Sequence, residues 1–247
     1  MKKHMVLGCY RFVGYHLCDF LLETGDEVIG VDWKSDMVED EREEKALSFG
    51  RNANFTFHSI DDEFEVKAEW VIHIPYYDFG NIQNDILIKI NDIVEESRLE
   101  GCLVIELYPY GVQLVDEAGK IRLISPTIYG PWQPSGELIQ SLLTNEAISS
   151  PGNGMVNDAL YVRDLVEEWP NILELKSDVY ELVSDLDYHL KSCLELANNK
   201  EEIILQEKRN IKHKKYEIKV KTKPEEGIYK QKKHMELQKK LQEWKKK

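Results

Sequence analysis

The spacing of hydrophobic positions changes twice near the start of the chain. Residues 4–8 form a short apolar strand that stops at Gly8, and apolar residues then recur at helical spacing over residues 12–22. A second apolar strand follows at residues 27–32 and ends in Asp32. A strand that stops at glycine, a helix, and a second strand that ends in an acid form the pattern of a dinucleotide-binding βαβ unit. We therefore predict such a unit here.

The pattern continues with alternating strands and helices. Further elements are predicted as strands at residues 55–57, 70–74, 102–105 and 121–124, with an amphipathic helix at residues 86–97. Strands that alternate with helices indicate a parallel sheet covered on both faces. The predicted fold class is α/β, a Rossmann-type doubly wound parallel sheet with a small C-terminal substrate-side subdomain.

Turn-forming residues are concentrated in residues 125–154, which contain repeated Pro and Gly pairs. Loops of this kind, lying over the carboxyl edge of a sheet, commonly shape a ligand crevice. We predict a Rossmann-type nucleotide-binding region at residues 1–134 and a substrate-side elaboration, interleaved with the sheet, at residues 135–222. A basic C-terminal helix is predicted at residues 223–247.

The C-terminal helix follows a plausible start at Thr222, and its residues Leu237, Leu241 and Trp244 fall on one face. We interpret it as a helix docked on the rest of the chain, with a solvated basic side. Contact with a membrane or a nucleic acid is the alternative for this lysine-rich segment.

Charge is distributed unevenly over the 247 residues, whose net charge is −13. Residues 200–247 hold 17 Lys and Arg against 8 Asp and Glu, which leaves 15 against 37 in residues 1–199. Because phosphate contacts need a basic face, the acidic body argues against nucleic-acid binding. No apolar run approaches the roughly 20 residues needed to cross a bilayer, and the N-terminal segment lacks a secretory core. We expect a cytoplasmic protein without a membrane partner.

The four cysteines are Cys9, Cys18, Cys102 and Cys193. They are far apart and show neither a CxxC pair nor a zinc-ligand spacing. We expect buried free thiols, and we predict no metal site.

Several segments resemble, in the same order, motifs of the NAD-dependent epimerase/dehydratase family, the extended short-chain dehydrogenases that act on nucleotide sugars. The segment VLGCYRFVGYHL at residues 6–17 is similar to the family's glycine turn, TGGAGFIGSHL. The other similar segments are EVIGVD at 27–32, WVIHIP at 70–75, IYGP at 128–131, DALYVRD at 158–164 and VYEL at 179–182. The resemblance extends over nearly the whole chain and implies the same fold.

The glycine turn departs from the family pattern at its middle position. Gly8 and Gly14 are in place, but the glycine that lets the backbone approach the pyrophosphate is replaced by Arg11. This side chain would crowd the phosphates, so dinucleotide binding is weakened or lost; alternatively, the guanidinium itself binds a phosphate. The resemblance implies the cofactor-binding residues Gly8, Arg11, Phe12, Val13, Gly14, Asp32 and His73.

Asp32 bears on the choice of cofactor. An acid at the end of the second strand accepts hydrogen bonds from a ribose diol and disfavours a 2′-phosphate, so NAD is favoured over NADP if either binds. The alternative is a carboxylate that caps the local loop. His73 lies where the family backbone lines the cofactor, and a structural, hydrogen-bonded histidine is the alternative there.

The family's catalytic helix is missing from the sequence. Its Tyr-x-x-x-Lys pair should follow Tyr110 after a loop, but the chain passes within about ten residues into the strand at 121–124. The catalytic serine or threonine position aligns with Glu106. This carboxylate is either a substitute general base or a strand-end acid that faces water or pairs with a lysine. Tyr110 and Tyr129 are the candidates for substrate binding.

We therefore predict an epimerase/dehydratase-like protein that is catalytically degenerate and retains at most nucleotide or dinucleotide binding. The alternative is an active NAD(P)-dependent nucleotide-sugar epimerase, dehydratase or reductase that uses substitute groups such as Glu106. A nucleotide or nucleotide sugar is the expected ligand. Because the family pairs through two helices and one is missing here, a monomer or a rebuilt homodimer is expected.

Overall fold

The computed structural model describes residues 2–33, 39–80, 82–114, 119–146, 157–197 and 213–245. Its strands are β1 Lys3–Leu7, β2 Glu27–Asp32, β3 Phe55–Ser59, β4 Trp70–Ile74, β5 Leu103–Pro109, β6 Lys120–Ser125, β7 Thr127–Tyr129, β8 Ala159–Tyr161, β9 Asp178–Ser184 and β10 Lys214–Ile218. Its helices are α1 Phe12–Glu23, α2 Glu39–Phe49, the 3-10 helix η1 Tyr76–Asp78, α3 Asn84–Leu99, α4 Leu138–Thr144, α5 Val162–Glu167, α6 Trp169–Ile172, α7 His189–Leu196 and α8 Pro224–Lys245.

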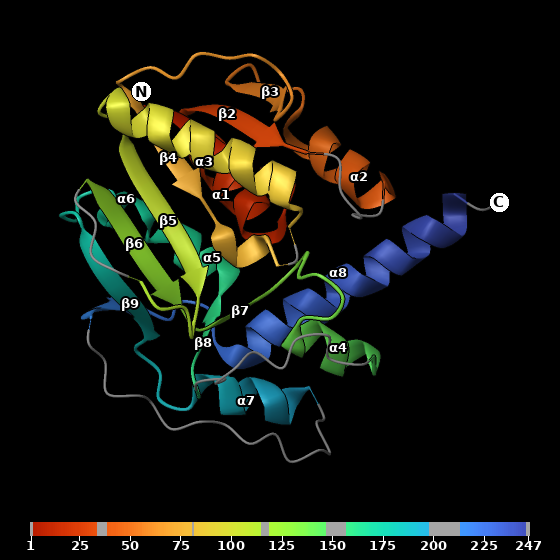
Figure 1. Cartoon of the computed structure of the whole chain (residues 1–247). Helices are drawn as coiled ribbons and strands as arrows, with labels where there is room; N and C mark the ends of the chain where they lie inside the picture. The colour runs from red at the N-terminus through yellow and green to blue at the C-terminus, as the bar shows by residue number, and fades with distance from the viewer. Residues whose placement is uncertain are drawn as a thin grey trace. The chain divides into compact units, whose positions relative to one another are not determined.

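Eight of these strands form one sheet in the order β10–β9–β6–β5–β4–β1–β2–β3, while β7 and β8 pair with each other. The pairs β1–β2, β1–β4, β2–β3, β4–β5 and β9–β10 are parallel. The strand order reverses at β1, with β2 on one side and β4 on the other. Because parallel crossovers are right-handed, this reversal places α1 and α3 on opposite faces of the sheet (Figure 1). The predicted Rossmann-type fold is confirmed.

The chain forms two compact units. Unit 1 comprises Met1–Tyr108, Leu114–Leu123 and Glu174–Val179, and unit 2 comprises Pro109–Gln113, Ile124–Leu173 and Tyr180–Lys247. The boundaries predicted at residues 134 and 222 remain predictions. The turn-rich residues 150–154 lie outside the described residues.

One core cluster of unit 1 fills the space between the sheet and α3. One face of α3 contributes Ile86, Ile90, Ile93 and Val94, at the helical spacing seen in the sequence. Alternate residues of β1, including Met5 and Leu7, meet this face from the sheet.

Unit 2 has its own core, built from β7, β8, α4, α7 and the start of α8. Its buried members are Tyr129, Leu138, Ile139, Ala159, Tyr161, Leu190, Cys193, Leu194 and Ile228. The sequence around α8 shows little apolar periodicity. Packing against this core, and not the helix propensity of the segment, therefore determines where α8 docks.

The C-terminal helix was predicted correctly, but its docking face was not. Gly227, Ile228 and Gln231, in the first two turns of α8, are buried. Leu237 and Trp244, which we expected to pack inward, are 53% and 81% exposed. Leu237 and Trp244 do recur at helical spacing. The buried face of α8, however, includes Gly227 and Gln231, whose small and amide side chains a search for apolar periodicity does not detect.

The described part of the chain also bears on the cysteines, on membrane spans and on metal sites. All four cysteines are buried free thiols, as predicted. Helices there are too short or too polar to span a bilayer. The same residues contain no cluster of three or more His, Cys, Asp or Glu side chains that could hold a metal ion.

Candidate functional site

The glycine turn at the end of β1 keeps the two backbone functions expected of Gly8 and Gly14. Gly8 has a φ of +73°, a conformation that favours glycine. A Cβ on Gly14 would collide with the carbonyl oxygen of Gly8, so only glycine allows α1 to approach β1 this closely. Together with Asp32 at the end of β2, we call the segment Gly8–Gly14 the cradle.

The N-terminus of α1 is occupied by a carboxylate from the same chain. Asp78 Oδ1 accepts the backbone N–H of Val13 at 3.0 Å, and its Oδ2 accepts that of Gly14 at 2.9 Å. The first N–H groups of a helix have no partner within the helix and carry the positive end of its dipole, so they bind anions. In this chain the anion is Asp78, supplied by η1.

Burial raises the pKa of Asp78 to about 7. The hydrogen bonds from Gly14 and Val13 lower the pKa of this carboxyl, as do the positive charges of Lys45 and Arg11. Asp78 is therefore a group whose charge changes near neutral pH.

Arg11 fills the other half of the cradle. Its guanidinium carbon lies 4.4 Å from the centroid of the Trp33 ring, within the range of a cation–π contact. Its Nε is 3.5 Å from Asp32 Oδ1, and only 16% of the side chain is exposed. Nε and Nη2 are buried and make no hydrogen bond within the described residues. The predicted crowding by Arg11 thus takes the form of a side chain folded back over the turn.

Asp32 caps the loop that surrounds it. It is 1% exposed, and its two oxygens accept the backbone N–H groups of Tyr10 at 2.8 Å and Trp33 at 2.7 Å. Burial raises the pKa of Asp32, and the Arg11 charge and the two amides oppose that rise. This geometry is that of a carboxylate that caps the local loop, which is the alternative to ribose binding for Asp32. A ribose diol would have to compete with these bonds.

An aromatic group covers Gly8. Phe79 contacts the position where a Cβ on Gly8 would lie, and its ring packs edge-on against Trp33 at 5.1 Å and Tyr76 at 5.4 Å. Tyr76 stacks in turn on Tyr108 at 4.8 Å. The segment after β4 therefore supplies both a carboxylate and an apolar cover to the cradle.

Lys45 is a buried cation on α2 next to the cradle. Its ammonium group donates to the carbonyl oxygen of Tyr10 at 3.0 Å and to Glu41 Oε1 at 2.6 Å. Burial lowers the pKa of Lys45, and the charge of Glu41 opposes that change. We did not select Lys45 or Asp78 from the sequence. The position of Asp78 just beyond a buried strand, at the carboxyl edge of the sheet, was the available signal.

The other predicted cofactor residues are buried. Phe12 and Val13 are 2% and 0% exposed. His73 is also fully buried, within β4, where its Nε2 is 2.9 Å from Nδ1 of His4 on β1. Burial and the neighbouring His4 lower the pKa of His73. This placement is that of a structural, hydrogen-bonded histidine.

Glu106 is enclosed in a polar cluster within unit 1. It is 3% exposed, pairs with Lys120 Nζ at 3.1 Å, and accepts the Tyr108 hydroxyl at 3.0 Å. Burial and the Glu106 charge raise the pKa of Tyr108, so this tyrosine stays protonated. Of the two alternatives for Glu106, the geometry is that of an acid paired with a lysine.

The two predicted substrate residues lie in unit 2. Tyr110 is half-buried in the turn after β5. Tyr129 is fully buried; its hydroxyl is 3.1 Å from His189 Nε2, and its ring packs edge-on against Tyr161. Tyr129 thus lies in the core of unit 2, and its role in substrate binding stays a prediction.

The segment between β5 and β6 contains no helix in its described residues, 110–114 and 119. Only residues 110–119 separate the two strands. A helix long enough to carry a Tyr-x-x-x-Lys pair on one face needs at least two turns plus connections. The ten residues between β5 and β6 are therefore few for such a helix, and its loss stays a prediction.

Comparison with solved structures identifies the architecture. The dTDP-glucose 4,6-dehydratase of Bacillus anthracis in complex with NAD matches with a TM-score of 0.60 and 13% identity, over 96% of this chain and 97% of that one. The UDP-glucose 4-epimerase of Thermotoga maritima with UDP-glucose gives 0.59 and 18% over 96% and 99%. An epimerase from Methanothermobacter thermautotrophicus gives 0.61 and 14% over 97% and 94%.

The chain has the fold of the nucleotide-sugar epimerases and dehydratases. At 13–18% identity this likeness concerns the fold. No family model matches the sequence. An uncharacterized 37.6 kDa protein of Escherichia coli O111:H- is 34% identical over 59 residues, which are 24% of this chain and 18% of that protein.

Proposed function

We propose that this chain is a catalytically inactive relative of the epimerases and dehydratases, in which its own side chains close the dinucleotide cradle. The observation that carries the proposal is the position of Asp78. Its carboxylate accepts the α1 amides of Val13 and Gly14, the groups that a Rossmann fold offers to a pyrophosphate. A dinucleotide phosphate would meet a negative charge at this point.

Arg11 supports the proposal from the opposite side. Its side chain lies over Trp33 and beside Asp32, in the space that a middle glycine leaves open. The cradle thus holds an internal anion and an internal cation. A bound dinucleotide would have to displace both and also break the bonds that cap Asp32.

The catalytic groups support the same conclusion. Glu106 is held by Lys120 on one carboxylate oxygen and by Tyr108 on the other, so a substrate proton would have to compete with both partners. The raised pKa of Tyr108 makes that residue a poor substitute for a catalytic tyrosine. The function that we propose for the chain is therefore to bind a partner, or to bind a nucleotide at a site outside the cradle. The four buried thiols support a reducing, cytoplasmic location.

The test is a binding titration of NAD and NADP, each followed by thermal unfolding and by calorimetry. Wild-type protein should give no saturable heat and no rise in Tm with either compound. Arg11→Gly/Asp78→Gly should bind NAD, because the cradle is opened while Gly8, Gly14 and Asp32 remain. At a hundredfold excess over Kd, binding stabilises a protein by about 2.7 kcal/mol. Asp32 favours NAD over NADP in the opened variant.

Asp62→Gly is the matched control for this titration. Asp62 also accepts a backbone N–H, that of Ser59 at 2.7 Å, but this bond is exposed and lies in the loop after β3, not at the N-terminus of α1. It should leave the binding result unchanged. Saturable NAD binding by the wild type would overturn the proposal, and so would a folded Arg11→Gly/Asp78→Gly variant that binds nothing.

The runner-up function is an active nucleotide-sugar enzyme in which Glu106 is the general base. Its test is turnover of UDP-glucose or dTDP-glucose in the presence of NAD or NADP. Turnover by the wild type that Glu106→Gln abolishes, in a variant that remains folded, would establish this function in place of the first.

A further inference from the structure

Helix α8 uses one face to join unit 2. Gly227 packs against the Tyr129 ring, and Gln231 donates from Nε2 to the side-chain oxygens of Gln133 at 2.8 Å and Gln140 at 2.9 Å. The C-terminal half of α8 continues past α4 and α7 (Figure 1). Only the first turns of the helix are therefore needed to hold it to unit 2.

The opposite face of α8 carries a second apolar stripe. Tyr229, Leu237 and Trp244 are 64%, 53% and 81% exposed, and Leu241 lies between the last two. At 100° per residue these four positions fall within about 120° of one another, turned well away from Gln231. We call them the α8 stripe. A helix that packs through one face and exposes apolar side chains on the other has that second face available for a partner.

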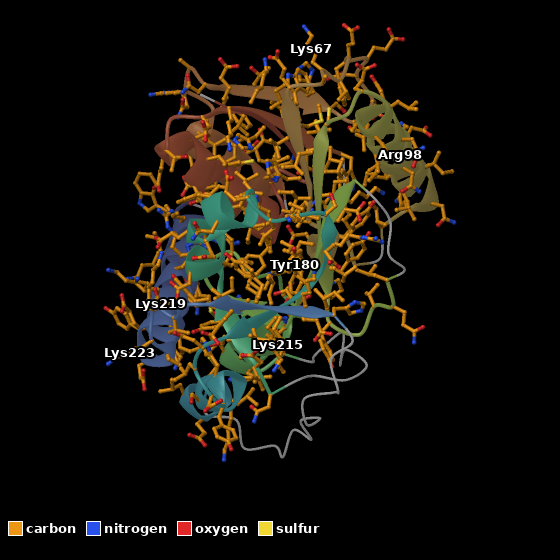
Figure 2. The ribbon with its side chains drawn as sticks, turned by 90° about the vertical axis from the view of Figure 1, so that its left-hand side faces the viewer. Lys67, Arg98, Tyr180, Lys215, Lys219 and Lys223 are labelled. Carbon is orange, nitrogen blue, oxygen red and sulfur yellow. The ribbon has the colours of Figure 1, made fainter. Side chains whose placement is uncertain are left out.

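Three exposed lysines of α8 fall within the α8 stripe. Lys230 pairs with Glu226 at 2.8 Å, whereas Lys233 and Lys240 are in no ion pair within the part of the chain that the structure describes. Lys219 and Lys223, which Figure 2 labels, are also exposed but precede α8. The α8 stripe therefore requires a partner surface that is partly apolar and negatively charged.

The exposed face of α3 has this composition. Ile88 and Leu99 are 60% and 78% exposed and lie three turns apart. Asp92 and Glu95 lie between them on the same face, and Glu95 pairs with Arg98 at the helix end (Figure 2). Ile88 to Leu99 spans about 16 Å and the α8 stripe from Tyr229 to Trp244 about 22 Å, so the α3 face is long enough to cover most of the stripe.

We propose that α8 docks on α3 of a second copy of this chain. The distribution of charge favours this partner, because residues 1–199 hold 37 acidic against 15 basic residues and the tail is basic. An anionic membrane or a nucleic acid would also attract the lysines, and the net charge of −13 opposes the approach of either as it opposes that of a second copy, so the experiments below separate these partners. The inference does not depend on the state of the cradle.

The contact is small and its charges are exposed, so the association is weak and depends on salt. Exposed ion pairs each contribute little and are screened at high ionic strength. The exposed apolar side chains, Trp244 above all, supply the rest. Association should therefore be visible at high protein concentration and low salt.

The first experiment is sedimentation velocity of the full chain over a hundredfold range of concentration, in 50 mM and 500 mM NaCl. The wild type should gain mass with concentration, with association at least tenfold weaker in high salt. Trp244→Ser should weaken association at least tenfold while circular dichroism remains unchanged. A wild type that stays monomeric at every concentration overturns the proposal.

The second experiment reverses the charges on each helix. Lys233→Glu/Lys240→Glu and Asp92→Lys/Glu95→Lys should each abolish self-association, since each then opposes like charges. An equimolar mixture of the two variants should associate again, because every α8–α3 contact between different variants joins opposite charges. Lys219→Glu/Lys223→Glu makes the same change in net charge off the stripe and should associate like the wild type.

Two further outcomes would show that α8 does not dock on α3 of a second copy. If the mixture of reversed variants stays monomeric, α3 is not the partner surface. Anionic vesicles of phosphatidylserine are added to the wild type in a separate arm. If they bind it, if Trp244→Ser abolishes that binding, and if no self-association is seen, the α8 stripe is a membrane surface and the proposal is wrong.

Discussion

The carboxylate of Asp78 lies 2.9 Å from the backbone nitrogen of Gly14, so η1 places a negative charge on the first turn of α1. The glycine that allows close packing against β1 also exposes this N–H. Asp78 therefore accepts the first α1 amides in the way that an N-cap residue would, although burial makes its charged form costly, and Arg11, the residue at the N-cap position, makes no side-chain capping bond.

The charge of Asp78 should make stability depend on pH. The pKa of this carboxyl is raised in the folded state to about 7 from 3.8, so the folded state binds the proton more tightly than the unfolded state does. Its contribution is fully present below pH 4 and is lost as the pH rises to about 7. Asp78→Asn should remove this fall, which is at most about 4 kcal/mol. Urea unfolding of both proteins from pH 4 to 8 measures the difference. Parallel curves would contradict it.

His189 should act in the opposite direction. Burial lowers its pKa from 6.5 to about 4, and its ring nitrogens contact the Tyr129 hydroxyl and the Ser184 hydroxyl. Because the unfolded chain binds the proton more tightly, stability is lost as the pH falls from 6.5 towards 4, by about 3 kcal/mol. His189→Gln should flatten this acid limb in the same urea series. An unchanged acid limb in a folded variant would exclude His189 as its source.

Gly14→Ala should be strongly destabilising, by about 2–4 kcal/mol, because the added Cβ meets the backbone oxygen of Gly8 and α1 must move. Gly25→Ala is the control. Gly25 has a φ of +86° and open space around it, so only the conformational cost of about 1 kcal/mol applies. Thermal unfolding compares the two. Equal losses would show that the close approach of α1 to β1 contributes nothing.

The pair formed by Glu106 and Lys120 should behave as a buried ion pair. Glu106→Gln or Lys120→Met alone leaves a buried charge without its partner and should cost about 3–5 kcal/mol. The double variant should lose less than either single variant, and a double-mutant cycle measures this coupling. Additive losses would mean that the two charges do not interact. If Glu106 were a working catalytic base, these variants would change turnover more than stability.

Much of the fold followed from the sequence because its causes are local and periodic. The Gly8 stop, the helical spacing after Phe12 and the acid at Asp32 each mark one boundary of the first βαβ unit, and the structure places β1, α1 and β2 there. Ile86 and Ile90 marked the inner face of α3 in the same way.

The contents of the cradle did not follow, because they depend on side chains that meet only after folding. Asp78 is 64 residues from Gly14 in the chain, and nothing in its local sequence indicates an amide partner. Arg11 was identified as an obstacle, but its contact with Trp33 depends on how the turn after β2 folds. The docking face of α8 was missed for the same reason, since Gln231 is buried only through bonds to Gln133 and Gln140.

The position of Asp78 also affects how a free nucleotide competes for the α1 amides and how easily the site could change in evolution. A carboxylate on a short segment of the same chain is a tethered competitor, and its effective concentration at the α1 amides far exceeds the millimolar values typical of flexible linkers. Under the proposed function, the cradle keeps its amides and excludes free nucleotides only through Asp78 and Arg11. Such a block would be reversible, because two substitutions would open the cradle while Gly8 and Gly14 remain in place.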